Sequence, residues 1–426
     1  MSSTGSSPLR MASVDEGLRL VMEASESGPI SHLEVDPRGH LSLDGAPRAW
    51  LGRLHVAETL VGRWPLPNRD CSVMDGFAVR SADLETRAEL RLAQAESAAG
   101  HPSAVPLERG HAVAISTGAV LPSGADMVVP VEDTEAMAGS LRIAEDARAR
   151  ARPGRFVRAR GSDLASDAIV AQAGDRLTAL RLAQLVAAGH HRIPVHRPPR
   201  VAILSTGDEL VPPGTTPGPG QVVSTNGLML AQLVVAAGGD VTFEDTVGDD
   251  PERTRTSFAQ ALEADLVLSS GGISVGAHDH VARACRELGV EFLFHKLRLR
   301  PGKPTTFGRR GPARVLALPG NPASSAVAFE LFARPWIAAW LGAPTPLPTR
   351  HVLPLAEDFR PEATREHWVR MRVRSEDGRL VPLETQTSGD LSSLAGTHWL
   401  AKVPAGDQPL RAGTPVEAFR PLGAED

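Results

Sequence analysis

Tyrosine is absent from the sequence, and all aromatic residues together make up only 4% of its 426 residues. Proteins that hold single-stranded nucleic acid stack its bases on aromatic side chains, so this scarcity disfavours such a surface. The net charge of −5 also argues against a general nucleic-acid binder. We therefore expect no nucleic-acid partner, and we interpret any basic cluster as local and specific.

Cysteine is scarce, and long apolar runs are absent. Neither Cys71 nor Cys285, the two cysteines, has a CxxC partner, so they form no disulfide framework, and a reducing compartment fits. No apolar run approaches the roughly 18 residues that a membrane span needs. We therefore expect a cytoplasmic protein with no membrane partner.

The length of the chain and the changes in its pattern of predicted helices and strands indicate several domains. A capping box at Ser13–Glu16 starts an N-terminal helix, and further helical patterns cover 51–60 and 163–188. We expect four parts: a discontinuous helical or mixed N-terminal domain (13–66 and 155–197), a β-rich inserted module (67–154), a central α/β domain (198–346) and a C-terminal β-barrel-like domain (347–426).

Strands and helices alternate in the central part, which predicts a parallel sheet with helices on both faces. We expect strands at 201–204, 241–247 and 266–268. We expect helices from Asn226, as the N-cap, to Gly238, from Asp249 or Asp250 with Pro251, and over 280–288.

Two loops of the central part have the composition of an anion-binding site. The loop 269–276 contains Gly271 and Gly272, and glycine permits positive φ and a close approach of backbone amides to a ligand. The turn 318–322 runs into a helix, with Asn321 suited to the N-cap and Pro322 to the first helical turn. Such a helix start directs free amides towards an anion.

Basic residues lie between these two loops. In a strand, the period of two in 296–300 places Lys296, Arg298 and Arg300 on one face and the leucines on the other, and Lys303 follows. Because ligands of open α/β sheets bind outside the carboxyl ends of the strands, we interpret this group as one wall of an anion pocket. The alternative is the solvated face of an edge strand.

Four carboxylates occupy loop positions: Asp75, Glu209, Asp249 and Asp279. Acidic residues that face a phosphate usually need a cation between them, and Mg²⁺ held by one or two carboxylates meets that need. Asp249 and Asp279 could instead be helix caps, and Asp75 the turn residue of its Asp-Gly pair. Glu209 has no such alternative role.

Six segments resemble the molybdopterin molybdenumtransferases (molybdenum insertases), to which the C-terminal part of gephyrin is also similar. The segments follow the order of the family between about residues 70 and 334. They are CSVMDGFAVR, ISTGAVLPSGADMVV, VAILSTGDELV, LVLSSGGISVGAHD, HKLRLRPGKPTTFG and ALPGNPASSAV.

The resemblance implies an enzyme that takes adenylylated molybdopterin and molybdate, releases AMP and leaves molybdenum on the pterin dithiolene. The central domain would then be the molybdopterin-binding domain. The family's functional positions fall on Asp75, Thr117, Glu209, Asp249, Asp279, Lys296, Arg300, Pro319 and Pro322.

The resemblance also implies a binding set and a metal set. The expected contacts to phosphate or molybdate are Gly271, Gly272, Ser274, Lys303, Pro319, Gly320, Asn321 and Pro322. Mg²⁺ would be held by some of Glu209, Asp249 and Asp279. A homodimer with composite sites is expected, because the family's β-rich module covers the active site of the partner, and a molybdopterin adenylyltransferase is a candidate partner protein.

Two other functions compete with this interpretation. A molybdopterin adenylyltransferase shares the α/β domain but usually lacks the flanking modules. A non-catalytic scaffold or binding protein is the second, since gephyrin also clusters receptors. The sequence departs from the family at Arg300, where lysine is frequent, and at Cys71–Met74 before the Asp-Gly pair. Arg300 keeps the charge but presents a planar fork.

Overall fold

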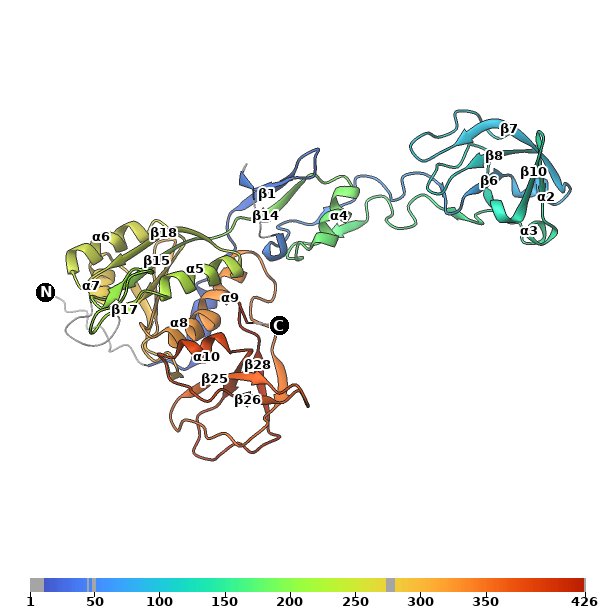
Figure 1. Cartoon of the computed structure of the whole chain (residues 1–426). Helices are drawn as coiled ribbons and strands as arrows, with labels where there is room; N and C mark the ends of the chain where they lie inside the picture. Colours follow the sequence, from blue (N-terminus) through green and yellow to red (C-terminus); the bar gives the residue numbers. More distant parts are fainter. Residues whose placement is uncertain (1–10, 44–45, 48–50, 273–279, 425–426) are drawn as a thin grey trace. The chain divides into compact units, whose positions relative to one another are not determined.

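The computed structural model describes residues 11–43, 46–47, 51–272 and 280–424. The chain divides into two compact units, one made of 1–58, 173–177 and 194–426 and the other of 59–172 and 178–193 (Figure 1). Within the part that the structure describes, no helix has the length and apolar character needed to cross a membrane.

The second unit is built on a six-stranded sheet with the order β10-β11-β7-β8-β6-β9. Its strands are β6 (Gly76–Val79), β7 (Glu89–Ser97), β8 (His111–Ile115), β9 (Met127–Pro130), β10 (Thr134–Met137) and β11 (Ser140–Ile143). The short helices α2 (Ser81–Leu84) and α3 (Glu145–Ala149) contribute Leu84 and Ala147 to its apolar core.

Two strand pairs and one helix complete this unit. They are β4 (Leu60–Val61) with β13 (Ile169–Ala171), β5 (Cys71–Ser72) with β12 (Val157–Arg158), and α4 (Ala179–Ala187). The helix predicted over 163–188 is therefore wrong for its first half. Asp167 and Gly174 have positive φ values of 59° and 86°, which no helix accommodates.

The helix predicted over 51–60 is also wrong. Only the 3-10 turn η1 (Leu51–Arg53) forms there, and His55 and Val56 pair in β-bridges with Arg176 and Val195. Long-range pairing has overridden a local helical pattern in this segment.

The first unit contains α1 (Val14–Glu23), and its predicted start is confirmed because Ser13, at the N-cap, accepts on Oγ a hydrogen bond of 3.1 Å from the Glu16 amide. A four-stranded sheet, which the sequence did not predict, follows in the order β14-β1-β2-β3. Its strands are β1 (Ile30–Val35), β2 (Leu41–Leu43), β3 (Ala46–Pro47) and β14 (Arg192–His196).

The central sheet has the order β18-β15-β19-β23-β22-β20. It is mixed, not wholly parallel as predicted. The neighbouring strands β18 (Asp240–Val247), β15 (Arg200–Thr206), β19 (Leu266–Ser270) and β23 (Ala313–Leu318) are parallel, whereas β22 (Thr306–Arg310) runs antiparallel to both of its neighbours, β23 and β20 (Glu291–His295). A short connection joins β22 to β23, so these two strands can only form a hairpin.

Helices cover the parallel strands. α6 (Pro251–Ala261) and α7 (His280–Glu287) share one core cluster with alternate residues of β15, β19 and β23, including Ala202, Val267 and Val315. α5 (Asn226–Ala237) packs against β15 and β18 and against α8 (Pro322–Ala328), which is followed by the π-helix η3 (Phe329–Ala333) and α9 (Arg334–Trp340). The pair β16 (Leu210–Val211) and β17 (Val222–Val223) lies between β15 and α5 along the chain.

Three adjacent parallel strands end level with one another. Ser205 of β15 pairs with Ser270 of β19, and Ser270 pairs with Leu318 of β23. The loops that leave these strands therefore start side by side, which is the position where α/β sheets bind ligands.

The C-terminal sheet has the order β21-β25-β27-β28-β24, with β26 paired to β25. Its strands are β21 (Leu299–Arg300), β24 (His351–Pro354), β25 (Glu366–Val373), β26 (Leu380–Pro382), β27 (Trp399–Val403) and β28 (Pro415–Phe419), and α10 (Leu391–Ala395) precedes β27. The strand β21 comes from the central part of the sequence, so Arg300 belongs to this sheet.

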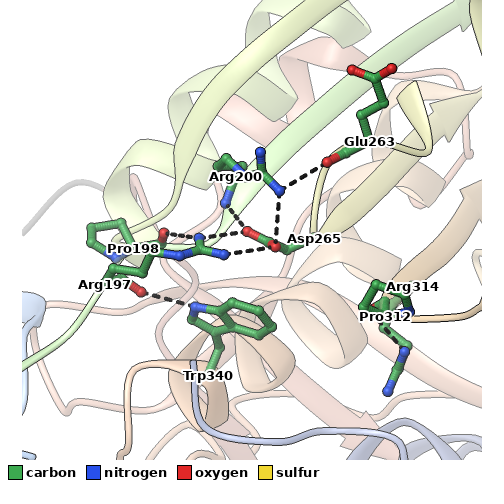
Figure 2. Close-up of polar contacts among 8 residues, drawn as sticks. All are labelled: Arg197, Pro198, Arg200, Glu263, Asp265, Pro312, Arg314 and Trp340. Carbon is green, nitrogen blue, oxygen red and sulfur yellow. Dashed lines mark hydrogen bonds and ion pairs between the residues drawn. The ribbon is translucent and has the colours of Figure 1, made fainter. Parts of the chain in front are cut away.

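A buried carboxylate fixes the opposite end of the parallel strands (Figure 2). Asp265, just before β19, accepts two hydrogen bonds from the Arg197 guanidinium, at 2.7 and 2.9 Å, and one of 2.7 Å from the Arg200 amide. The Trp340 ring lies under the Arg197 guanidinium, and Trp340 Nε1 donates a hydrogen bond to the backbone carbonyl oxygen of Arg197. Burial would raise the pKa of Asp265, but these hydrogen bonds and both guanidinium charges outweigh it and lower the pKa.

We predict that Asp265→Asn lowers the free energy of unfolding by about 3 kcal/mol near pH 7, because it leaves Arg197 without its counter-charge. A depressed carboxyl pKa stabilises the fold above the unfolded-state pKa of about 3.9, and this stabilisation is lost as the pH falls through the folded-state pKa. Urea unfolding of the wild type and of Asp265→Asn should therefore show a constant difference in the free energy of unfolding between pH 6 and 8. This difference should become smaller below about pH 4. Glu244→Gln, on the exposed face of β18, is the control. A stability difference between wild type and Asp265→Asn that does not change at acid pH would contradict the lowered pKa of Asp265.

Candidate functional site

A cavity of about 560 Å³ opens at the carboxyl ends of the central parallel strands. Its volume lies in the range of small-molecule sites. Its wall, within the first unit, comes from the ends of β15 and β19, the turn after β23, the start of α5, the β16–β17 pair, Pro304 and residues near α10. Among the predicted site residues, Glu209, Pro319, Gly320, Asn321 and Pro322 line it.

Glycines with positive φ, as predicted, bring the backbone close together at this edge. Gly271 has φ 96°, and a Cβ there would lie 2.4 Å from the Thr206 carbonyl oxygen. Gly272 also has a positive φ, of 62°. The Gly271 amide donates to the Leu318 carbonyl, so the loop after β19 begins directly beside the turn after β23.

Asn226 joins the strand ends instead of capping α5, which corrects the predicted role. The N-cap position belongs to Thr225, whose side chain makes no capping bond. Asn226 Nδ2 donates to Ser270 Oγ at 2.8 Å and to the Gly320 carbonyl at 2.6 Å. The amide therefore ties α5 to both loops and leaves its oxygen for another donor.

Buried oxygens without partners face this region. Among the described residues, Thr206 Oγ1, Asn226 Oδ1 and Ser269 Oγ are inaccessible to solvent and make no hydrogen bond. Leaving such a group unsatisfied costs about 1–3 kcal/mol. Thr206 and Asn226 line the cavity, whereas Ser269 does not, so the first two oxygens lie directly behind its wall.

Three carboxylates of the central part, Glu209, Asp249 and Asp250, have different surroundings. Glu209 lines the cavity, and its carboxylate lies against Gly207, where a Cβ would be 2.3 Å from Glu209 Oε2. Asp250 is the N-cap of α6 and accepts from the Arg253 amide at 2.9 Å. Asp249 is therefore released from the capping role; its amide donates to Asp208 Oδ1 at 2.8 Å, and its side chain is exposed.

Two predicted site residues, Ser274 and Asp279, lie outside the described residues. Within the described ranges, no group of three or more His, Cys, Asp or Glu side chains could hold a metal ion. Glu209 and the exposed Asp249 are hard oxygen donors on neighbouring loops. Such a set fits a Mg²⁺ ion that gains its remaining ligands from water and substrate phosphates, not from a protein cage.

The predicted basic strand is interrupted. Lys296 has φ 73° and follows the end of β20, Leu297 pairs with Ala12, and β21 resumes only at Leu299. The alternation itself is confirmed, because Leu297 and Leu299 are fully buried while Lys296 and Arg300 are half-buried. Pairing with two different partners breaks the segment into pieces.

The basic residues Lys296, Arg300 and Lys303 are absent from the described wall of the cavity. Pro304 does line it, so the exposed Lys303 is next to the wall along the chain. Of the three predicted cations, only Lys303 is therefore a chain neighbour of the wall, and Lys296 and Arg300 are outside the lining.

The turn after β23 is held by the C-terminal part of the chain. Pro322 occupies the first turn of α8 as predicted, but Asn321, although at the N-cap, donates from Nδ2 to Ser388 Oγ at 2.8 Å. The Ala323 amide donates to the Ser388 carbonyl. We call residues 385–391 the C-terminal strap; its Gly389 and Leu391 line the cavity.

Arg370, in the middle of β25, was missed from the sequence. Its side chain is fully buried and donates to the carbonyls of Thr385 and Thr387 in the strap, at 3.3 and 2.9 Å. Its Nη1 has no partner among the described residues. A charged residue at an inward position of a strand was the available signal, because buried arginines are rare.

Positive charge gathers around Arg370. Burial, followed by the charges of Arg300 and Arg370, lowers the pKa of His367 to about 3. Burial also lowers the pKa of Arg370, and the charge of Arg300 lowers it further. Arg300 therefore acts on the same buried region as the strap-holding arginine.

Asp75 and Thr117 belong to the second unit and lie next to each other there. The Thr117 amide donates to Asp75 Oδ1 at 2.6 Å, and hydrogen bonds from Thr117 lower the pKa of Asp75. Gly76 starts β6, and a Cβ there would lie 2.1 Å from the Val129 carbonyl oxygen. The Asp-Gly pair thus has a packing requirement as well as an exposed carboxylate.

Three family models match successive parts of the chain. The MoeA N-terminal region (domain I and II) matches residues 13–189, the "Probable molybdopterin binding domain" matches 202–339, and the MoeA C-terminal region (domain IV) matches 352–419. The central match contains the β15, β19 and β23 ends that form the cavity.

Curated proteins and solved structures agree with these matches. The chain is 34% identical to molybdopterin molybdenumtransferase 2 of Mycobacterium tuberculosis over 83% of this chain and 89% of that protein. It is also 34% identical to the molybdopterin molybdenumtransferase of Synechococcus elongatus, over 88% and 94%. The crystal structure of a molybdopterin biosynthesis MoeA protein from Pyrococcus horikoshii matches with a TM-score of 0.81 at 28% identity, covering 96% of this chain and 99% of that one.

We predict that Thr206→Val raises the free energy of unfolding of the ligand-free protein by about 1 kcal/mol, because it removes a buried hydroxyl without a partner. Thr254→Val is the matched control: Thr254 is also buried, but its Oγ1 donates to the Asp250 carbonyl at 2.7 Å, so this variant should lose stability. Urea unfolding measures both. A loss of stability in Thr206→Val equal to that in Thr254→Val would show that Thr206 is satisfied within the protein.

Proposed function

Because the chain belongs to the molybdopterin molybdenumtransferase family, we propose that it inserts molybdenum from molybdate into adenylylated molybdopterin, with release of AMP, in molybdenum cofactor biosynthesis. The observation that carries the proposal is the cavity at the level ends of β15, β19 and β23, with unsatisfied buried oxygens in its wall. We propose that a local rearrangement of the wall brings N–H donors of the pterin nucleotide to Asn226 Oδ1 and its phosphate acceptors to the Thr206 hydroxyl, because solvent reaches neither atom in this structure.

We assign the anionic part of the substrate to the loops around Gly271 and Gly320. Their backbones approach each other closely, since a Cβ at Gly320 would lie 3.5 Å from Gly271 Cα. Amides in such a loop, with Pro319, Asn321 and Pro322 in the wall, can face phosphate or molybdate oxygens. Lys296, Arg300 and Lys303, with Gly272 and Ser274 on the adjacent loop, complete the proposed binding set.

We propose that some of the carboxylates of Glu209, Asp249 and Asp279 would hold Mg²⁺ together with the substrate phosphates. When bound, it would offset phosphate charge and polarise the phosphoanhydride. Glu209 is the strongest member of this set, because its side chain already lies at the cavity wall with Gly207 making room for it.

Asp75 and Thr117 are proposed to act on the same reaction from the second unit. The low pKa of Asp75 keeps its carboxylate charged at neutral pH. We propose a homodimer in which this module completes the site of the partner subunit, and a molybdopterin adenylyltransferase as the supplier of the substrate.

The C-terminal strap favours insertion over adenylyl transfer. Gly389 and Leu391 form part of the cavity, and Ser388 holds Asn321, so the C-terminal domain contributes directly to the site. A protein that consisted of the α/β domain alone would lack this wall. A scaffold without catalysis would have no use for unsatisfied oxygens at the strand ends.

We predict that the purified protein releases AMP from adenylylated molybdopterin in the presence of molybdate and Mg²⁺, and that Glu209→Ala lowers the rate about 100-fold or more, because a charge-organising carboxylate is lost. Chromatographic quantification of AMP measures the rate, and Glu244→Gln is the control for loss of an exposed carboxylate. Formation of adenylylated molybdopterin from ATP, without its consumption, would instead identify an adenylyltransferase.

The composite-site proposal adds a second arm to this experiment. If Asp75→Asn and Glu209→Ala are both inactive, a mixture allowed to exchange subunits should regain about a quarter of wild-type activity, since half of the dimers carry one intact site of two. A mixture that stays inactive, although mixed dimers are detected, would place both residues in the site of one subunit.

A further inference from the structure

A second cavity, of about 440 Å³, lies in the first unit and contains none of the residues assigned above. Three separate segments form most of it: the turn at 52–55, the bridge segment at 174–176, and the stretch from Arg334 in α9 to Thr349. Ala237 and Leu422 complete the lining. We call it the arginine cavity, because Arg53, Arg176 and Arg334 all line it.

The three guanidinium groups are close enough to affect one another. Burial lowers the pKa of Arg53, and the charges of Arg176 and Arg334 lower it further. Like charges gathered at one cavity repel each other, so the arrangement is unfavourable unless an anion joins them. Arg176 is held by a bond of 2.6 Å from Nε to the Gly52 carbonyl, and Arg334 by Glu330 at 2.8 Å and the Arg420 carbonyl at 3.0 Å.

Arg53 is the member that remains available. Its guanidinium has no hydrogen-bond or ion-pair partner among the residues that the structure describes. The base of its side chain packs against Gly238 at the end of α5, where an added Cβ would lie 2.8 Å from Arg53 Cβ. An unpaired guanidinium beside two others can bind a dianion with paired N–H donors.

His55 adds a neutral polar group to the same wall. Its Nδ1 is buried and makes no hydrogen bond within the described part of the chain. Burial, and then the charge of Arg176, lowers the pKa of His55, so the ring is neutral at pH 7. The nearby carboxylates are Asp175, in the wall, and Glu330, which Arg334 neutralises, so the cavity keeps an excess of positive charge.

Part of the lining is apolar. Ala338 and Leu341 of the α9 end face the cavity together with Pro344, Pro346 and Leu347 of the proline-rich connection to the C-terminal domain. A bare inorganic anion would leave this wall and much of the volume unused. An anion with an apolar body would use both.

We propose that the arginine cavity is a second ligand site that binds an organic phosphate ester. The phosphate lies at Arg53, Arg176 and Arg334, with His55 as a further hydrogen-bond partner, and the organic body lies against the proline-rich wall. The site is independent of the cavity at the strand ends, so it stands or falls separately from the proposed function.

Calorimetric titration of the full-length protein with phenyl phosphate tests this site. The wild type should show a binding event that Arg53→Gln weakens about tenfold or more, since a charge-assisted contact is lost. Arg372→Gln, which removes an exposed arginine on β25 outside both cavities, should leave the isotherm unchanged. Phenyl phosphate should bind the Arg53-dependent site several-fold more tightly than inorganic phosphate does.

Two results would overturn the proposal. One is the absence of any phenyl phosphate binding that Arg53→Gln alters, whatever binds elsewhere on the protein. The other is equal affinity of the Arg53-dependent site for phenyl phosphate and inorganic phosphate, which would exclude a role for the apolar wall. Because Glu209 lies outside this cavity, Glu209→Ala should retain the event even where AMP release is lost.

Discussion

The level ending of three adjacent parallel strands is the constraint on which the rest of the structure depends. Backbone pairing places Ser205, Ser270 and Leu318 in one row, so the loops that follow them meet at one edge. At the other end, Asp265 holds Arg197 and the Arg200 amide and so fixes where β15 and β19 begin. A shift of register at that ion pair would displace every group at the cavity.

The site is assembled from segments distant in the sequence, and polar side chains hold them together. Asn226 ties α5 to the loops after β19 and β23, and Asn321 ties the second of these loops to the C-terminal strap. Arg370, buried in another sheet, fixes the strap from behind. Two of these side chains use only part of their hydrogen-bonding capacity, because Asn226 Oδ1 and Arg370 Nη1 have no partner among the described residues. The cavity is thereby kept ready for a polar ligand.

Local chemistry in the sequence predicted much of the central fold and the position of the cavity. Capping at Ser13, glycine at 271 and proline at 322 depend on near neighbours, so their roles could be inferred correctly. The roles of Asn226 and Asn321 could not, because their partners lie 44 or more residues away. Pairing of β21 with the C-terminal sheet is equally remote, so the basic segment was predicted as one strand. The carboxylate alternatives at the start of α6 needed coordinates, which assign the cap to Asp250.

The central claim is that the pterin nucleotide binds at the strand ends, and a crystal structure of the protein with AMP, Mg²⁺ and molybdate tests it most directly. We predict density for the nucleotide phosphate between the loops at Gly271 and Gly320, with Thr206 Oγ1 within hydrogen-bond distance of a ligand oxygen. A nucleotide bound elsewhere, with the cavity at the strand ends holding only water, would contradict the account.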